Sequence, residues 1–322
     1  MSIPLWLMDA VEERSSLHSP KKLALAYSVL NKTYKDNRAT SVASSENDLF
    51  WDAYLAARFP ATYGAVEKAL DEIPQSILAK IQTVLDIGTG TGAAVFAMAQ
   101  ALSQKITFTC LDQEAQSQEI MDFLWQKSPY EDNFAFHWMN CDIQKGLPQS
   151  LETYDAVVCS YTLGETNSIQ KILEDAWNKT RHIFILIEPG TMPGFSIIKK
   201  AREFLCSQGA FIAAPCPHND PCPMEHGNWC HFSARIPRSS CMRKIKGGEL
   251  GYEDEKFSYC AFVRESIDCP SARILRHPQI HGGHVSLQLC TKQGIQDCLV
   301  SKKNSQYKKA RKSSWGDSWD MP

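Results

Sequence analysis

Three cysteines, Cys216, Cys222 and Cys230, lie close together in the segment 215–231, and the first two are each followed by proline. The first residues of the chain show no basic leader, and Glu12 and Glu13 follow at once, which argues against a secretory or transit peptide. A reducing compartment keeps thiols unpaired, so such a group of cysteines favours metal chemistry over disulfide bonds. The sequence therefore predicts an inorganic centre in this segment.

The spacing of these cysteines narrows the choice of centre. Five residues separate Cys216 from Cys222 and seven separate Cys222 from Cys230, whereas structural zinc sites usually bring paired ligands two to four residues apart. Iron–sulfur clusters accept more varied spacings, and some cluster-binding runs place proline after a ligating cysteine. The pattern favours an iron–sulfur cluster, with structural zinc as the alternative. Three histidines could each replace a thiolate: His218, His226 and His231.

A fourth thiolate is expected, because iron–sulfur clusters are usually held by four cysteines. The downstream candidates are Cys241, Cys260, Cys269, Cys290 and Cys298. We select Cys290, because it ends the alternating run 284–290, a strand pattern preceded by a Gly-Gly turn. A ligand at a strand end is held rigidly. The cysteines in or beside apolar runs are instead expected to be small buried hydrophobes: Cys110, Cys141, Cys159 and Cys206.

A second chemical signal is the glycine-rich segment 84–92, which follows a strand pattern and opens an alanine-rich helix. Its turn contains Gly88, Thr89, Gly90 and Gly92. Glycines at such a turn let a ligand approach the backbone without a Cβ collision. With Ala93, the turn also satisfies the dinucleotide fingerprint G-x-G-x-x-G/A. Alone, it fits either a nicotinamide dinucleotide or S-adenosylmethionine (SAM).

Acidic residues at three predicted strand ends favour SAM. Asp86 precedes Gly88 by two positions, where a carboxylate could orient the turn or meet the methionine ammonium but would repel a pyrophosphate. Asp112 ends the second predicted strand, where it could accept hydrogen bonds from ribose hydroxyls. Asp142 follows the third strand and could bind the adenine amino group while Ile143 packs on the ring. We therefore expect SAM as the cofactor.

These residues need a scaffold that places successive strand ends side by side. With 322 residues, 43% of them hydrophobic, the chain can form a packed core. From residue 83 onward, continuous apolar runs alternate with helix-length segments, which predicts an α/β protein with a mostly parallel sheet covered on both faces. The strand patterns are 83–87, 106–111, 135–139, 156–159 and 183–187. Two later runs, 229–236 and 257–263, are expected to complete the sheet.

Three regions are predicted around this sheet. Residues 1–77 have the pattern of a helical extension, and residues 78–265 form the SAM-binding core with a cysteine-rich insertion at 214–232. Residues 266–322 carry short strand patterns and a basic tail, which indicates a small β module.

The net charge of −2 conceals an asymmetry, because residues 231–322 are net positive and residues 1–230 net negative. Six basic residues lie close together around Tyr307: Lys302, Lys303, Lys308, Lys309, Arg311 and Lys312. Basic and aromatic residues together suit phosphate neutralisation and base stacking, and a solvated basic tail is the alternative. No apolar run is long enough to cross a bilayer. We expect a soluble cytoplasmic protein, most simply a bacterial one, with no membrane partner.

Several phrases together resemble a known family. They are the strand-end signature above, the segments 160–165 and 188–191, the cysteine run, the Trp-Cys-His-Phe-Ser phrase at 229–233, the Tyr-Glu-Asp-Glu-Lys-Phe-Ser-Tyr phrase at 252–259 and the segment 283–285. From about residue 20 to residue 318, the chain resembles the methyltransferase-like proteins associated with the mitochondrial small ribosomal subunit and their bacterial relatives. The cysteine and acidic-aromatic phrases are the specific part of the match.

The resemblance implies a class I methyltransferase (Rossmann-like) fold and action on the small ribosomal subunit or its RNA (rRNA) during assembly. It also implies a four-iron four-sulfur cluster, and the family's cysteine pattern falls on Cys216, Cys222, Cys230 and Cys290. Mitochondrial members carry a targeting leader, and none is evident here, so the resemblance leaves the expected cytoplasmic location in place.

The residues for catalysis are less well marked. The segment 159–165, at the usual place after the fourth strand, lacks the Asn/Asp-Pro-Pro-aromatic motif of exocyclic-amine methyltransferases and the Pro-Cys pair of pyrimidine-carbon methyltransferases. Glu165 could act as a base and Tyr161 could stack on a flipped base, or both could be structural. Two functions therefore remain open: an rRNA methyltransferase, and a non-catalytic assembly factor that uses SAM and the cluster structurally. In either case we expect a monomer away from the ribosome.

Overall fold

The computed structural model describes residues 3–35, 48–102, 104–130, 133–225 and 227–321. Within these ranges the N-terminal region is helical, as predicted. Its helices are α1 (Leu5–Ser15), α2 (Pro20–Lys35), α3 (Asp48–Leu70) and α4 (Gln75–Leu78). The boundaries proposed at residues 77 and 265 stay predictions, because chain topology alone does not divide the molecule into independent units.

The main sheet has eight strands in the order β3-β2-β1-β4-β5-β8-β6, with β7 paired to β8. The strands are β1 (Thr83–Ile87), β2 (Ile106–Asp112), β3 (Phe134–Asn140), β4 (Tyr154–Ser160), β5 (Thr180–Pro189), β6 (Phe211–Ala214), β7 (Phe232–Pro237) and β8 (Tyr252–Val263). Strands β1 to β5 run parallel, and β8 is antiparallel to its neighbours β5, β6 and β7. This is a Rossmann-like methyltransferase fold with a mostly parallel sheet.

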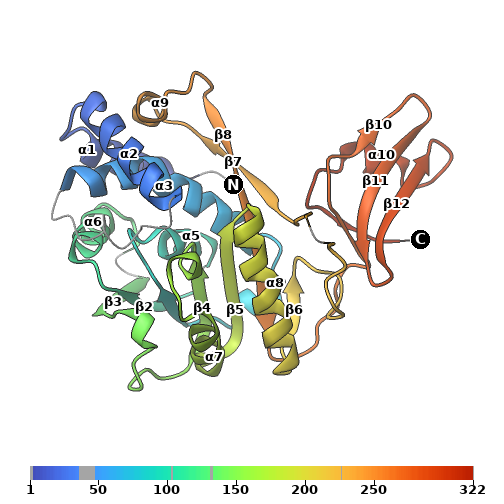
Figure 1. Ribbon diagram of the computed structural model, residues 1–322, viewed down its shortest axis with the longest axis horizontal. Coiled ribbons are helices and arrows are strands. Elements are labelled where there is room, and N and C mark those ends of the chain that lie inside the picture. Colours follow the sequence, from blue (N-terminus) through green and yellow to red (C-terminus); the bar gives the residue numbers. More distant parts are fainter. Residues whose placement is uncertain (1–2, 36–47, 103, 131–132, 226, 322) are drawn as a thin grey trace.

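Successive residues of the central strands point to opposite faces of the sheet, and both faces are buried. Val84 packs in the core that includes α1, α3, α5 (Ala93–Ala101) and α6 (Ala115–Gln126), and Leu85 packs in the core of α7 (Ile169–Lys179) and α8 (Met192–Ser207). Burial on two sides explains why these strands are continuous apolar runs rather than alternating ones. Figure 1 shows the helices on either side of the sheet.

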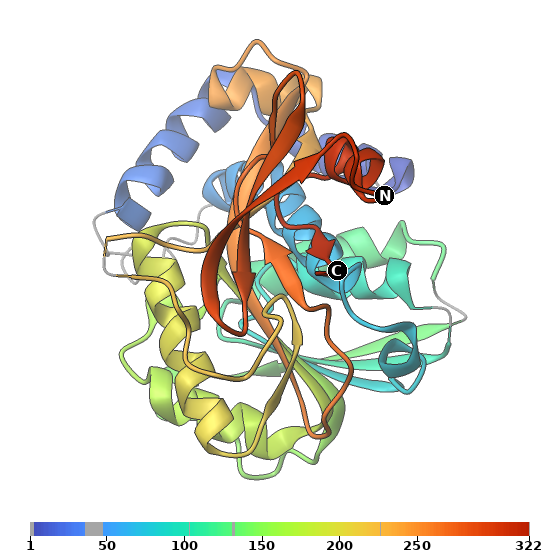
Figure 2. The ribbon, with the colours of Figure 1, turned by 90° about the vertical axis from the view of Figure 1, so that its right-hand side faces the viewer.

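The C-terminal residues form a separate antiparallel sheet in the order β10-β11-β9-β13, with β12 paired to β11. Its strands are β9 (Ala272–Ile274), β10 (Gln279–Ile280), β11 (His284–Thr291), β12 (Gly294–Ser301) and β13 (Ser318–Trp319). It has its own apolar core, which includes the fully buried Trp319 and a residue of α10 (Tyr307–Lys312). Figures 1 and 2 show this sheet standing beside the main sheet, on the side of α8 and β6.

Some elements differ from the sequence prediction. β6 was not predicted, and neither was α9 (Ser240–Lys246), which precedes β8. β7 begins at Phe232 instead of residue 229, because its pairing with β8 ends at the Phe232–Phe257 pair. The three residues before it leave the sheet. Among the described residues, no helix is both long enough and apolar enough to span a membrane.

Candidate functional site

The glycine turn between β1 and α5 depends on three positive φ angles: 70° at Gly88, 51° at Gly90 and 84° at Gly92. A Cβ at Gly88 would lie 2.4 Å from side-chain atoms of Thr162, and one at Gly92 would lie 3.1 Å from Met121. A side chain at Gly88 would therefore clash with Thr162, whereas one at Gly92 would require Met121 to shift. A Cβ at Gly90 would meet no atom within 4 Å, so Gly90 leaves open space beside the backbone for a ligand.

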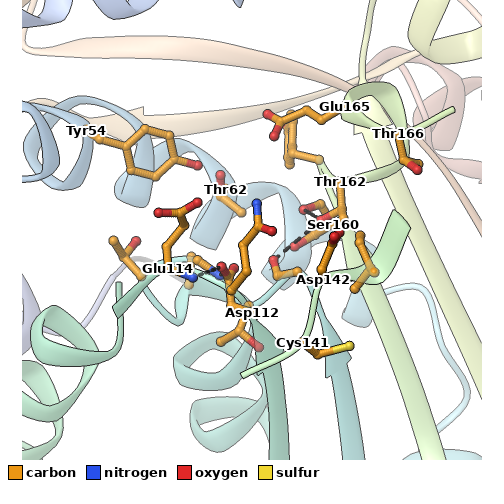
Figure 3. Close-up of a pocket in the computed structure, with 18 of the residues that line it drawn as sticks. Tyr54, Thr62, Asp112, Glu114, Cys141, Asp142, Ser160, Thr162, Glu165 and Thr166 are labelled. Atoms are coloured by element: carbon orange, nitrogen blue, oxygen red, sulfur yellow. Dashed lines mark hydrogen bonds between the residues drawn. The ribbon is translucent and has the colours of Figure 1, made fainter. Parts of the chain in front are cut away.

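A cavity lies over this turn, at the carboxyl ends of β1, β2 and β4 (Figure 3). The strand order changes direction between β1 and β4, which is where open α/β sheets bind ligands. The predicted residues that line the cavity are Gly88, Thr89, Gly90, Asp112, Asp142, Ile143, Tyr161 and Glu165. Asp86 and Gly92, also predicted as cofactor-binding residues, are not among the residues lining it. Asp86 lies within β1, and Gly92 is the residue directly before α5.

Asp112 connects the end of β2 to the glycine turn. The Gly90 N–H donates to its Oδ2 at 2.7 Å, and the Glu114 N–H donates to its Oδ1 at 3.0 Å. Burial raises the pKa of this carboxyl, and the two backbone hydrogen bonds oppose the rise. Each carboxylate oxygen has two lone pairs, so Asp112 can still accept hydrogen bonds from a ligand in the cavity.

Asp142 and Ile143 follow β3 and line the cavity. Asp142 caps the short 3-10 helix η2 (Ile143–Lys145) by accepting a hydrogen bond from the Gln144 N–H at 3.1 Å. The cap fixes the carboxylate at the cavity wall. The Lys145 ammonium lies 3.2 Å from Oδ2 of Asp142 and is itself exposed.

Asp86 is buried, with 1% of its surface exposed, and neither carboxylate oxygen has a hydrogen-bond partner among the described residues. Burial raises its pKa to about 7. The turn is held through the Asp86 backbone instead, because the Thr89 hydroxyl donates to its carbonyl oxygen at 3.1 Å. An unpaired buried carboxylate is costly, so this group fits a site that is completed by a cationic ligand.

Tyr161, the first weak catalytic candidate, has a strained backbone and an occupied hydroxyl. Its φ of 56° is the only positive value at a non-glycine residue within the described ranges. The hydroxyl donates to Glu255 on β8 at 2.9 Å, and the guanidinium carbon of Arg58 lies 5.5 Å from the ring centroid. Arg58 also pairs with Glu255 at 3.2 Å. Strain held in place by such contacts is common at functional sites, and these contacts fix the ring at the cavity wall.

Glu165, the second candidate, lies at the cavity mouth. Figure 3 shows its carboxylate on the same side of the cavity as Tyr54, with Asp112 and Glu114 below. The surrounding protein and the nearby Asp112 charge raise its pKa to about 7. The Glu165 side chain is nevertheless exposed, so solvent screening weakens this pKa shift. The neighbouring Glu188 is structural, because its Oε1 accepts the Leu163 N–H at 2.9 Å inside the core.

The sequence analysis missed the contribution of α3 to the cavity. Trp51, Tyr54 and Thr62 of this helix line it, and the rings of Trp51 and Tyr54 contact each other edge to face at 5.9 Å. Two aromatic residues three positions apart on a helix were the available signal, but they fit ordinary core packing equally well. Glu114, two residues after Asp112, was also missed.

A second cavity collects the predicted metal ligands. It is lined by Cys216, Cys222 and Cys230 from the loop between β6 and β7 and by Cys290 from β11. The cavity therefore joins two segments that are distant in sequence and lie side by side in Figures 1 and 2. Cys260 of β8 lines it too, whereas Cys241, Cys269 and Cys298 do not.

The histidines differ in position. His218 lines the cysteine cavity, with Nε2 at 3.8 Å from the Cys290 sulfur. His231 lies outside it, where its ring stacks on Trp229 at 5.6 Å and meets Trp315 at 4.4 Å. His226 lies outside the described residues.

The lining of the cysteine cavity offers four predicted thiol ligands for a metal ion or cluster. Across the described ranges, no three His, Cys, Asp or Glu side chains are grouped closely enough to hold a metal ion. Tetrahedral zinc with bonds of about 2.3 Å would require thiolate sulfurs only about 3.8 Å apart. A polynuclear group would bind one thiolate at each of several metal atoms. Burial raises the pKa of Cys222, Cys230 and Cys290, so these thiols stay protonated without a metal.

A family model described as "Mitochondrial small ribosomal subunit Rsm22" matches residues 50–320. The chain belongs to the Rsm22 family. A human relative of this Rsm22-family protein, the "Ribosome assembly protein METTL17, mitochondrial", is 29% identical over 297 residues, with 82% of this chain and 61% of the relative covered. The "Rsm22-cox11 tandem protein 2, mitochondrial" of Schizosaccharomyces pombe is 23% identical, with 82% and 42% covered. The chain thus spans less than two thirds of these relatives.

These relatives correct one prediction. We expected a cytoplasmic protein, and that prediction is wrong, because the family description and the names of both relatives are mitochondrial. The inference rested on the absence of a basic leader in the first residues, and that absence is not informative about where a protein of this family acts.

Solved structures resemble this Rsm22-family protein more distantly. The magnesium protoporphyrin IX methyltransferase from Synechocystis PCC 6803, solved with bound S-adenosylhomocysteine, is 16% identical, with 76% of this chain and all of that chain covered at a TM-score of 0.42. A likeness of this size carries no argument about ligand or reaction. The fold assignment rests on the strand order and directions described above.

Proposed function

We propose that this Rsm22-family protein binds SAM in the cavity over the glycine turn. The charge of the lining supports this most directly. Four carboxylates line the cavity, those of Asp112, Glu114, Asp142 and Glu165, and none of the described lining residues is Lys, Arg or His. Such a lining attracts the sulfonium and ammonium of SAM. It disfavours the pyrophosphate of a nicotinamide dinucleotide.

Each side chain has a role in this proposal. Gly90 allows the ligand to approach the backbone, Asp112 accepts hydrogen bonds from the ribose hydroxyls, and Asp142 with Ile143 holds the adenine. Asp86 acts from β1, where its unpaired carboxylate favours positive charge in the cavity. These roles follow the predicted ones, except that Asp86 acts at longer range.

We further propose that the protein acts on the small ribosomal subunit or its rRNA during assembly and transfers a methyl group there. The family description names the small ribosomal subunit, and the human relative is named as a ribosome assembly protein. When bound, SAM supplies an activated methyl group, and alignment with a nucleophile provides much of the rate. Glu165 is suited to accept the proton released by the nucleophile, because its carboxylate lines the cavity and carboxylates serve as general bases. Tyr161 positions the acceptor beside it.

A second candidate function is assembly without methyl transfer. It is favoured by the engagement of Tyr161, whose hydroxyl is already donated to Glu255 and whose ring lies under Arg58. In this case SAM and the metal centre brace a surface that docks on the subunit. The human relative is itself named as a ribosome assembly protein.

Transfer of a radiolabelled methyl group from SAM to immature small-subunit particles separates the two functions. The wild-type protein should label the RNA of these particles, and Asp112→Ala should abolish labelling. The control is Glu119→Ala, an exposed acidic residue of α6 that does not line the cavity. Binding of SAM without labelling of any particle would favour the non-catalytic function.

We also propose that Cys216, Cys222, Cys230 and Cys290 hold a four-iron four-sulfur cluster. The convergence of these four thiols on one cavity supports this proposal. When bound, the cluster supplies a covalent cross-link between the β6–β7 loop and the C-terminal sheet. Iron, acid-labile sulfide and zinc analysis of anaerobically purified protein tests this. Stoichiometric zinc without sulfide would contradict it.

A further inference from the structure

Arg202 of α8 is a buried cation that lines the cysteine cavity. Only 3% of its surface is exposed. Its Nη2 donates to the carbonyl oxygen of His218 at 2.9 Å and also to that of Asp220. Both carbonyls belong to the loop that carries Cys216 and Cys222. Arg202 therefore holds this loop against α8 and keeps its guanidinium beside the cavity.

The positive charge of Arg202 has no carboxylate partner within the described ranges. Its Nε is also buried without a hydrogen-bond acceptor there. Arg273, the other arginine lining the cavity, differs because Glu72 neutralises it. A buried cation that is neither paired nor fully hydrogen-bonded is costly. The cavity is thus built to receive negative charge next to Arg202.

Cys216, one of the proposed cluster ligands, lines the same cavity as Arg202 and would carry negative charge as a thiolate once it binds metal. Four thiolates and an iron–sulfur core together carry net negative charge, and a one-electron reduction adds one more. A guanidinium in a low-dielectric cavity stabilises the more negative state. Hydrogen bonds to cluster sulfurs and nearby charges are among the factors that set cluster potentials.

We propose that Arg202 sets the reduction potential of the cluster by donating its free N–H to a sulfur ligand and by stabilising the reduced state. This inference rests on the proposed iron–sulfur site. Arg202 is a positioning residue in this role, because it touches a ligand of the cluster and the loop that carries it. The expected consequence is a potential higher than that of the same site without the guanidinium.

Redox titration of the reconstituted full chain, followed by electron paramagnetic resonance, tests the proposal. In Arg202→Gln, the reduced-to-oxidised ratio at a fixed potential should fall about tenfold or more, equivalent to a negative shift of ~59 mV for a one-electron couple. The matched control is Lys200→Gln, which removes one charge from an exposed position of the same helix. Its potential should equal that of the wild type.

If Arg202→Gln does not retain a cluster, Arg202→Lys is the second variant to measure. It keeps the charge on a compact ammonium and loses the planar fork, so its potential should lie below the wild-type value. If Arg202→Gln binds the cluster, a reduction potential equal to that of the wild type would overturn the proposal. If only Arg202→Lys binds the cluster, an unchanged potential in that variant would overturn it. Failure of the wild-type chain to bind iron and sulfide would instead remove the cluster itself, so the two failures are distinguishable.

Discussion

Gly88 and Thr162 meet where β1 and β4 end, and both line the proposed SAM cavity. A Cβ at Gly88 would lie 2.4 Å from the Thr162 side chain, and the φ of Gly88 is 70°. Gly88→Ala should therefore destabilise the protein by roughly 2–4 kcal/mol, from strain plus overpacking, and weaken SAM binding. Urea denaturation and calorimetry measure both effects.

Gly209→Ala is the matched control for this prediction. Gly209 also has a positive φ, of 84°, but a Cβ there would meet nothing within 4 Å. It should show the strain cost alone, about 1 kcal/mol, with SAM binding unchanged. Equal effects of the two substitutions on stability and binding would contradict the role assigned to the Gly88–Thr162 contact.

At the scale of one residue, the Asp86 carboxyl should make the free energy of unfolding depend on pH. Burial raises its pKa from 3.8 to about 7, so the folded protein binds more protons than the unfolded chain between these values. The stability of the ligand-free protein should therefore fall as pH rises from about 4 to about 7. Relative to Asp86→Asn, the loss should be on the order of 2–4 kcal/mol.

Urea denaturation of both proteins at pH 5 and pH 8, without ligand, measures this difference. The variant removes the titrating group, so other buried acids such as Glu188, whose pKa is raised to about 8, contribute equally to both curves. A stability difference that is the same at both pH values would show that Asp86 is not the origin.

At the scale of secondary-structure elements, the proposed iron–sulfur cluster would connect the β6–β7 loop to β11. Cys290→Ser should abolish iron–sulfur absorbance and speed proteolysis of the C-terminal third, since the link between the two segments is lost. Cys298→Ser is the control, because Cys298 lies on the adjacent strand β12 but does not line the cysteine cavity. Absorbance spectra and limited proteolysis compare the variants, and equal iron contents would refute the assignment.

Strands with a clear pattern of hydrophobic residues were predictable from the sequence. The strands β1 to β5 were found because burial on both faces makes them continuous apolar runs. Cys290 was selected as the fourth ligand because it lies in the alternating pattern of β11, and its role as a ligand stays a prediction although it lines the cysteine cavity. The position of α3 over the SAM cavity was not predictable, because a helix shows which face is apolar but not which cavity that face covers. The four-residue strand β6 was too short to give a pattern.

At the scale of the whole molecule, acidic and basic residues lie in different regions. The SAM cavity is lined by carboxylates, while Lys308, Arg311 and Lys312 are exposed on α10 of the C-terminal sheet. RNA phosphates should therefore bind the C-terminal sheet and not the cavity mouth. This separation would let one end of the molecule dock on RNA while the other holds SAM.

Lys308→Gln with Lys312→Gln tests this division. The variant should bind small-subunit rRNA more weakly, and the slope of log affinity against log salt should fall by about 0.7–0.9 per lost phosphate contact. Lys80→Gln with Lys105→Gln removes the same charge from exposed positions near the main sheet and should leave the slope unchanged. Equal slopes for both double variants would place the RNA-binding surface elsewhere.

The central claim is that the acidic cavity over the glycine turn is a SAM site. Calorimetric titration of the wild-type protein and Asp112→Ala with SAM and with NAD+ tests it most directly. We predict that the wild type binds SAM, that Asp112→Ala binds it at least about tenfold more weakly because ribose hydrogen bonds are lost, and that NAD+ gives no binding heat. Absence of SAM binding to the wild type, or tighter binding of NAD+, would contradict the account.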